Sequence, residues 1–190
     1  MEKIALVFPG IGYHTDKPLL YYSKKLAMKS GYRTIDVSYT GLPAGVKGNA
    51  EKMEQCFYMA LEQTEKIFEQ VNLADAKILV LAKSIGTAVA AAYIKNRQLQ
   101  ADFLYYTPVE QTFSFMKEKS GIVFTGTADP WVDTETVRQG CEDKNLPLTV
   151  IPQANHSLET GDVRKDLEIL QQVMKESEAY IAGINREILL

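Results

Sequence analysis

Three residues of the 190-residue chain have side chains that together could carry out nucleophilic catalysis: Ser84, Asp129 and His156. A serine hydroxyl is a weak nucleophile until a base removes its proton, and a neutral histidine can act as that base. A carboxylate beside the histidine would fix its tautomer and stabilise the imidazolium that forms. The chain contains only two histidines, so the base would be either His156 or His14.

Each of these residues also has a simpler interpretation when it is taken alone. Ser84 precedes an Ala-rich helical pattern and could serve only as its N-cap. Asp129 precedes Pro130 and could be an ordinary turn residue. His156 could be a surface residue of a loop. The interpretation therefore depends on where the three residues lie relative to the expected strands.

Short β-rich segments alternate along the chain with longer helical patterns. We expect strands at Ile4–Phe8, Arg33–Tyr39, Lys77–Leu81, Asp102–Tyr106, Gly121–Thr125 and Leu148–Ile151. Helices are expected at Pro18–Lys29, along the apolar stripe from Met53 to Val71, at Thr87–Asn96, at Thr134–Lys144 and from Asp162 onward. This alternation predicts one domain, residues 1–190, with a three-layer α/β/α architecture around a doubly wound, mostly parallel six-stranded sheet.

The three chemically active residues follow different strands of this expected sheet. Ser84 comes after the third strand, Asp129 after the fifth and His156 after the sixth. Ligands of such sheets bind at the carboxyl ends of the strands, so we expect the three side chains to meet there. Asp133 is the alternative acid, but Asp129 lies closer to a strand end. A serine on a sharp strand-to-helix turn needs small neighbours two positions away on each side, as the sequence has at residues 82 and 86.

Four segments of the chain resemble the α/β-hydrolase family: Phe8-Pro9-Gly10-Ile11-Gly12, Ala82-Lys83-Ser84-Ile85-Gly86, Gly126-Thr127-Ala128-Asp129 and Asn155-His156. The family's turn reads Gly-x-Ser-x-Gly, and Ala82 replaces its first glycine. The family's oxyanion loop often begins with histidine, where this chain has Pro9. The resemblance implies a small serine hydrolase without a lid, with Ser84, His156 and Asp129 as its catalytic triad. It also implies an oxyanion hole formed by the backbone N–H groups of Ile11 and Ile85.

The segment from Thr107 to Ser120 is too short for a folded cap, so we expect a shallow, open site. Such a site suits a small ester or thioester, or an exposed group on a larger molecule. The candidates for lining it are Tyr13, His14, Tyr106 and Trp131. The tyrosines could instead be partly buried in the core. Lys83, beside the proposed nucleophile, is expected to face outward or to support the turn.

Composition and motifs limit the other function classes. The chain has 21 Lys+Arg against 24 Asp+Glu and no basic block, so we expect no nucleic-acid partner. We expect no metal, because a zinc site of several Cys and His would need nearly all of the two cysteines and two histidines. We expect no cofactor, because Gly10-Ile11-Gly12 lacks the third glycine of a dinucleotide fingerprint and residues 82–84 lack the glycines of a P-loop. The two distant cysteines, and the absence of a signal-peptide pattern or a membrane-span pattern, indicate a cytoplasmic protein.

Two other classes of function stay open at this point. One is a non-catalytic binding domain that retains the α/β-hydrolase fold. The other is a doubly wound domain that binds phosphate or flavin, against which the missing glycine-rich loop argues. The apolar stripe of the last helix extends to Ile188-Leu189-Leu190, which suggests a homodimer contact.

Overall fold

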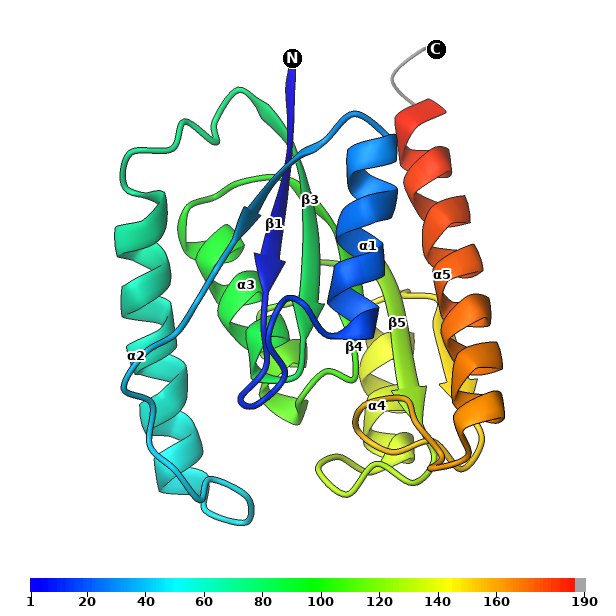
Figure 1. Cartoon of the computed structure of the whole chain (residues 1–190). Coiled ribbons are helices and arrows are strands. Elements are labelled where there is room, and N and C mark those ends of the chain that lie inside the picture. The colour runs from blue at the N-terminus through cyan, green and yellow to red at the C-terminus, as the bar shows by residue number, and fades with distance from the viewer. Residues whose placement is uncertain (187–190) are drawn as a thin grey trace.

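A sheet of six parallel strands runs through the part of the chain that the computed structural model describes, residues 1–186 (Figure 1). The strands are arranged in the order β2-β1-β3-β4-β5-β6, and every neighbouring pair is parallel. Their bounds are β1 (Glu2–Phe8), β2 (Arg33–Asp36), β3 (Ala76–Lys83), β4 (Ala101–Tyr106), β5 (Gly121–Gly126) and β6 (Leu148–Ile151). The predicted fold class is therefore confirmed.

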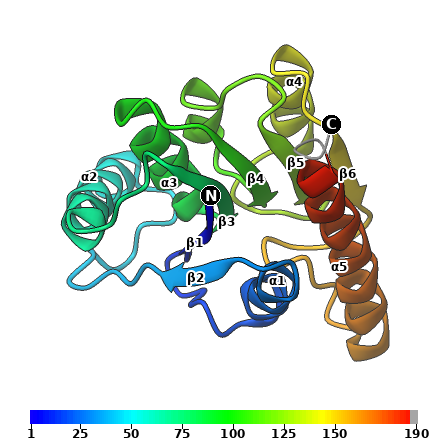
Figure 2. The same ribbon diagram turned by 90° about the horizontal axis from the view of Figure 1, so that it is seen from above.

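Helices cover both faces of this sheet and complete the three layers (Figure 2). One face carries α1 (Pro18–Lys29) and α5 (Val163–Arg186). The other face carries α2 (Ala50–Phe68), α3 (Ile85–Asn96) and α4 (Thr134–Asp143). Between β4 and β5 the chain forms a single short 3₁₀ helix, η1 (Glu110–Ser114), and no folded cap.

The central strands are apolar at nearly every position because both of their faces are buried. In β1, Ile4 and Leu6 pack into the core beneath α2 and α3, whereas Ala5 and Val7 pack into the core beneath α1 and α5. Successive side chains of a strand point to opposite faces, so one apolar run supplies both cores. Packing on both faces fixes the position of the sheet, and the carboxyl ends of its parallel strands lie along one edge.

Several expected boundaries differ from the structure. β2 is an edge strand that pairs only with β1, and it ends at Asp36 rather than Tyr39. β3 continues to Lys83, whose partner in the neighbouring strand is Tyr106. α3 begins at Ile85, directly after the proposed nucleophile. The expected dimer contact at residues 188–190 lies outside the described residues. Within residues 1–186, no helix combines the length and apolar character that crossing a bilayer requires.

Candidate active site

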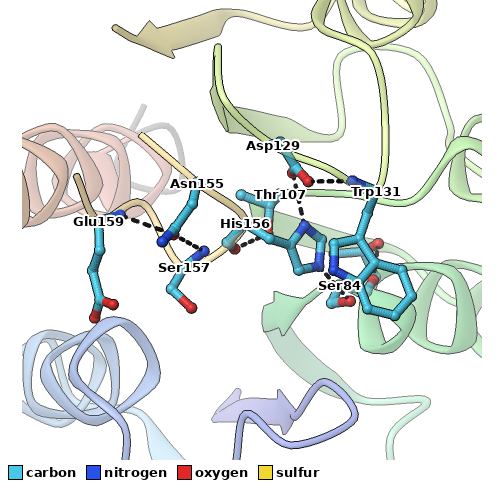
Figure 3. Close-up of polar contacts among 9 residues, drawn as sticks. Ser84, Thr107, Asp129, Trp131, Asn155, His156, Ser157 and Glu159 are labelled. Atoms are coloured by element: carbon cyan, nitrogen blue, oxygen red, sulfur yellow. Dashed lines mark hydrogen bonds and ion pairs between the residues drawn. The ribbon is translucent and has the colours of Figure 1, made fainter. Parts of the chain in front are cut away.

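Ser84, His156 and Asp129 lie together at the carboxyl ends of β3, β6 and β5 (Figure 3). The Nε2 atom of His156 is 2.7 Å from the Oγ atom of Ser84. The Nδ1 atom of the same ring is 2.7 Å from the Oδ2 atom of Asp129. A carboxylate can only accept hydrogen bonds, so Nδ1 carries the proton and Nε2 is free to accept one from the serine. The arrangement can therefore move a proton from Ser84 onto His156.

Ser84 occupies a strained turn between β3 and α3. Its backbone has φ = 57° and ψ = −129°, a left-handed conformation that costs a non-glycine residue about 1–3 kcal/mol. The turn is held because the backbone N–H of Ser84 donates to the carbonyl of Tyr106, at 3.0 Å. Ser84 precedes the first residue of α3, but its side chain makes no capping hydrogen bond. The hydroxyl is directed to His156 instead, so the interpretation of Ser84 as only a helix cap is wrong.

Glycine at position 86 allows this turn to pack against the end of β1. A Cβ atom there would lie 2.4 Å from the carbonyl oxygen of Pro9 and 2.7 Å from that of Phe8. Gly10 is also close to the turn, since its own Cβ would lie 3.0 Å from the Cβ of Ser84. The small residues around the turn thus bring the loop after β1 to the side of Ser84.

Two backbone N–H groups proposed for the oxyanion hole belong to residues that line one pocket with Ser84. Ile85 is the first residue of α3, and the first N–H groups of a helix have no acceptor within it. Ile11 lies in a tight turn in which Gly10 and Tyr13 exchange two backbone hydrogen bonds, of 3.0 and 3.3 Å. Both residues border the same pocket as Ser84. The structure thus brings together the two segments on which the oxyanion prediction depends.

Asp129 is fixed in place by a second hydrogen bond. Its side chain is 1% exposed, and Oδ1 accepts from the backbone N–H of Trp131 at 2.8 Å. The alternative acid, Asp133, instead caps α4 by accepting from the N–H groups of Glu135 and Thr136. Asp129, and not Asp133, is therefore the carboxylate in contact with His156.

The loop after β6 holds His156 by contacts that the sequence analysis did not identify. Thr107 donates its hydroxyl to the backbone carbonyl of His156, at 3.0 Å. The side chain of Asn155 accepts from the N–H groups of Ser157 and Glu159 (Figure 3). An asparagine directly before the histidine was a usable signal for such a side-chain-stabilised turn. These bonds position the imidazole without taking part in proton transfer.

The surroundings of His156 favour its neutral form. Burial lowers the pKa of the imidazole below its usual value, and the charge of Lys83 acts in the same direction. The hydrogen bond to Asp129 opposes these effects, because a carboxylate stabilises the imidazolium. The net shift is downward, so His156 is mainly neutral at pH 7 and available as a general base.

Two adjacent hollows lie at the candidate site, and Ser84 lines the first of them. The first, which we call the nucleophile pocket, has a volume of about 190 Å³ and is lined by Ile11, Gly12, Tyr13, Lys17, Met53, Lys83, Ser84, Ile85, Trp131, His156 and Ser157. The second, the apolar groove, has a volume of about 590 Å³ and runs between α2, α3 and η1. Its apolar lining includes Met53, Phe57, Ile85, Val109, Phe115 and Trp131. Met53, Ile85 and Trp131 border both hollows, so the groove adjoins the nucleophile pocket.

Of the four candidates for substrate contact, Tyr13 and Trp131 line the nucleophile pocket, and His14 and Tyr106 do not. His14 is exposed, and its Nδ1 accepts from the backbone N–H of Asp16. Tyr106 is fully buried, so the prediction that it contacts substrate is wrong. It points toward α1 and α5, where its hydroxyl lies 2.7 Å from Ser23 Oγ and 2.9 Å from Ser177 Oγ.

Lys83 differs most from expectation. Its side chain is buried and lines the nucleophile pocket, so the expectation that it faces outward is wrong. The physical reason is strand periodicity: Lys83 follows Leu79 and Leu81 on the face of β3 that packs beneath α1 and α5. Within the described residues, no three His, Cys, Asp or Glu side chains are grouped as metal ligands would be.

Neither a protein-family model nor a curated protein matches the sequence. Solved structures do match, among them a protein of unknown function from Agrobacterium tumefaciens that is classed provisionally as an α/β hydrolase. It has a TM-score of 0.66 and 19% identity, over 98% of this chain and 87% of that one.

Two further neighbours have named properties. A Xanthomonas campestris protein described as an α/β serine hydrolase without a lid has a TM-score of 0.58 and 14% identity, over 90% of this chain and 79% of that one. Est1E from Butyrivibrio proteoclasticus, solved with ferulic acid bound, has a TM-score of 0.67 and 12% identity, over 95% of this chain and 90% of that one. At these identities the likeness establishes the fold: residues 1–186 have the α/β-hydrolase fold, with no lid domain between β4 and β5.

Proposed function

We propose that the protein is a serine hydrolase that cleaves carboxylic esters or thioesters through an acyl-enzyme. The observation that carries this proposal is the pair of 2.7 Å contacts that link Ser84 to His156 and His156 to Asp129. Ser84 sits on a strained turn at the start of a helix, which is the position of an activated nucleophile in this fold. The proposal assigns Ser84 as nucleophile, His156 as base and Asp129 as the acid that orients it.

The reaction then proceeds in two halves. Ser84 Oγ attacks the carbonyl carbon while its proton passes to Nε2 of His156, and the N–H groups of Ile11 and Ile85 stabilise the oxyanion. The intermediate collapses when the bond to the alcohol or thiol breaks and His156 protonates that leaving group. Water attacks the acyl-enzyme in the second half, with His156 again accepting the proton. The acid leaves and the Ser84 hydroxyl is restored.

The apolar groove supports an ester with an uncharged organic group of moderate size. It adjoins the nucleophile pocket and is bordered by the stacked rings of Phe57 and Phe115, whose centres are 5.5 Å apart. Burial of an apolar acyl or alcohol group there would contribute binding energy in proportion to the area covered. Est1E, which shares the fold, binds ferulic acid, a carboxylic acid with an aromatic ring.

A fluorophosphonate probe tests the proposal because it forms a covalent bond only with an activated serine. We expect the wild-type protein to be labelled and Ser84→Ala to be unlabelled. Ser157→Ala is the matched control, since Ser157 lines the same pocket but does not contact His156 through its hydroxyl. Undiminished labelling of Ser84→Ala would contradict the assignment. A folded wild type that does not react would favour the non-catalytic binding domain.

A further inference from the structure

The buried lysine beside the proposed nucleophile has no role in the proton transfer described above. Lys83 is 1% exposed, and it is the residue directly before Ser84. Its ammonium lies 5.1 Å from the centre of the Tyr13 ring, and both residues line the nucleophile pocket. Within the described residues, Nζ of Lys83 has no hydrogen-bond acceptor and no ion-pair partner. Burying an ammonium without a direct ion-pair partner is costly, so the position calls for an explanation.

Two other lysines lie at the same site. Lys17 lines the nucleophile pocket, with Nζ 5.2 Å from the centre of the Tyr13 ring. Nζ of Lys47 lies 6.0 Å from the centre of the Trp131 ring, which also lines the pocket. In the described part of the chain, no carboxylate lies within ion-pairing distance of any of these three ammonium groups. By contrast, Lys24 on α1 pairs with two carboxylates, those of Asp16 and Asp36.

The nearby carboxylates do not balance this charge. Asp129 raises the pKa of Lys83 by its charge, but its own oxygens are occupied by His156 and by the N–H of Trp131. Glu159 acts on Lys83 in the same direction, yet it is exposed to solvent. Lys83 and Lys17 are the lysines that line the nucleophile pocket, and no Asp or Glu of the described residues lines it with them, whereas Glu54 and Glu110 line the adjoining groove.

We propose that the nucleophile pocket binds a carboxylate of the substrate through Lys83, with Lys17 as a second cation. The substrates would then be esters or thioesters that carry a carboxylate a few atoms from the scissile carbonyl. This inference rests on the proposed function and adds the substrate class to it. The pocket, at about 190 Å³, has room for a compact anion beside the reacting carbonyl, and the adjoining groove accepts the uncharged part.

The protonation behaviour of Lys83 is consistent with this assignment. Burial lowers the pKa of its ammonium to about 7, with the charge of Lys17 acting in the same direction. Asp129 and Glu159 oppose the shift. A bound carboxylate would stabilise the ammonium and raise this pKa, so the anion would supply the direct ion-pair partner that Lys83 lacks among the described residues.

Two matched pairs of substrates test the proposal. The first pair is 4-nitrophenyl hydrogen adipate and 4-nitrophenyl methyl adipate, in which the acyl side carries or lacks the carboxylate. The second pair is S-acetylthioglycolate and its methyl ester, in which the thiol side carries or lacks the carboxylate. Values of kcat/KM are compared at pH 6.5 for wild type, Lys83→Met, Lys17→Met and Lys25→Met. The control Lys25 is an exposed lysine on α1 whose ammonium also lies over a tyrosine ring, that of Tyr21, away from the pocket.

We expect the wild type to prefer the anionic member of at least one pair by about tenfold, since a charge-assisted hydrogen bond is worth at least that ratio. The ratio of kcat/KM for the anionic substrate to that for its methyl ester should fall to about one in Lys83→Met. It should fall by about threefold in Lys17→Met and stay unchanged in Lys25→Met. The proposal is overturned by the absence of preference in both pairs, or by a preference that survives Lys83→Met. Should Lys83→Met fail to fold, an unchanged ratio in Lys17→Met overturns it.

A binding measurement separates this inference from the proposed function. Trp131 is the only tryptophan of the chain and borders the pocket, so its fluorescence reports occupancy. We expect Ser84→Ala to bind methyl hydrogen adipate at least tenfold more tightly than dimethyl adipate, and Lys83→Met in that background to remove the difference. If hydrolysis depends on Ser84 but shows no preference for the anionic substrate, the carboxylate-binding inference is overturned and the proposed function is kept. If anion binding depends on Lys83 but the protein hydrolyses none of the esters, the proposed function is overturned and the anion-binding site is kept.

Discussion

Nε2 of His156 lies 2.7 Å from Oγ of Ser84, although 72 residues separate them in the sequence. β3 and β6 are not neighbours in the sheet, since β4 and β5 lie between them. The contact therefore depends on the loop after β6 reaching back across the ends of two strands. Gly126 permits this approach, because a Cβ there would lie 2.1 Å from the carbonyl oxygen of Ala154.

Asp129→Asn should lower kcat on 4-nitrophenyl butyrate by about 10⁴-fold. The N–H of Trp131 donates to Oδ1, so an asparagine would keep its oxygen there and turn its NH₂ group toward His156. Nδ1 would then have to accept, which places the imidazole proton on Nε2 and blocks proton transfer from Ser84. Asp133→Asn is the control, because asparagine also caps helices and this side chain does not contact His156. A loss of similar size in both variants would reject the assignment of Asp129.

The pH profile should report the titration of His156. The base acts in its neutral form, so kcat/KM for a neutral ester should rise with pH and reach a plateau. Because burial and the charge of Lys83 lower the pKa of His156, half of the plateau should be reached below pH 6.5. Lys83→Met removes one of these causes, so its midpoint should shift to higher pH. A wild-type midpoint above 6.5, measured by initial rates, would contradict this account.

Lys83→Met should stabilise the fold at pH 6 by about 2 kcal/mol, because it replaces a buried ammonium by an apolar side chain. The pKa of Lys83 is about 7 in the folded protein and near 10.5 when unfolded. Below pH 7 both states carry the charge and the full burial cost applies. Between pH 7 and 10.5 the folded state loses the proton first, so the wild type gains stability. Urea unfolding should therefore show a smaller difference between the two proteins at pH 9 than at pH 6, and an equal difference at both would oppose this explanation.

Gly86→Ala should lower the free energy of unfolding by about 2 kcal/mol or more. Alanine normally favours a helix, but a Cβ at this position would overlap the carbonyl oxygens of Pro9 and Phe8. Gly183→Ala in α5 is the matched control, because a Cβ there would have no atom within 4 Å. This control should gain about 0.5–1 kcal/mol. Equal effects in the two variants, measured by urea unfolding, would show that the turn does not depend on close packing at Gly86.

Ser114→Trp should discriminate between short and long acyl groups. Ser114 is an exposed residue at the edge of the apolar groove, so an indole there would occupy part of its volume. We expect kcat/KM for 4-nitrophenyl hexanoate to fall about tenfold, and that for the acetate to change less than twofold. The acetate serves as the internal control, because it does not extend into the groove. A uniform loss on both esters would mean that the groove does not bind the acyl chain.

The sequence by itself determined the fold class and the strand ends at which Ser84, Asp129 and His156 lie. Apolar runs bounded by turn residues locate buried parallel strands, and parallel strands place all their carboxyl ends at one edge. This is why three residues scattered over the chain could be predicted to converge. Strand ends were predicted less accurately than strand positions: β2 pairs with β1 only from Arg33 to Asp36, although the apolar pattern continues to Tyr39.

Only the tertiary structure decided which side chains face the pocket. Tyr106 and Lys83 are register partners on adjacent strands and share one face of the sheet. Tyr106 is covered completely and hydrogen-bonds to Ser23 on α1 and Ser177 on α5. Lys83 is buried too, yet it borders a pocket that the loop carrying Tyr13 completes. The residues that cover the end of a strand come from segments distant in the sequence. The presence of lysines in the pocket could therefore be seen only in the packed structure.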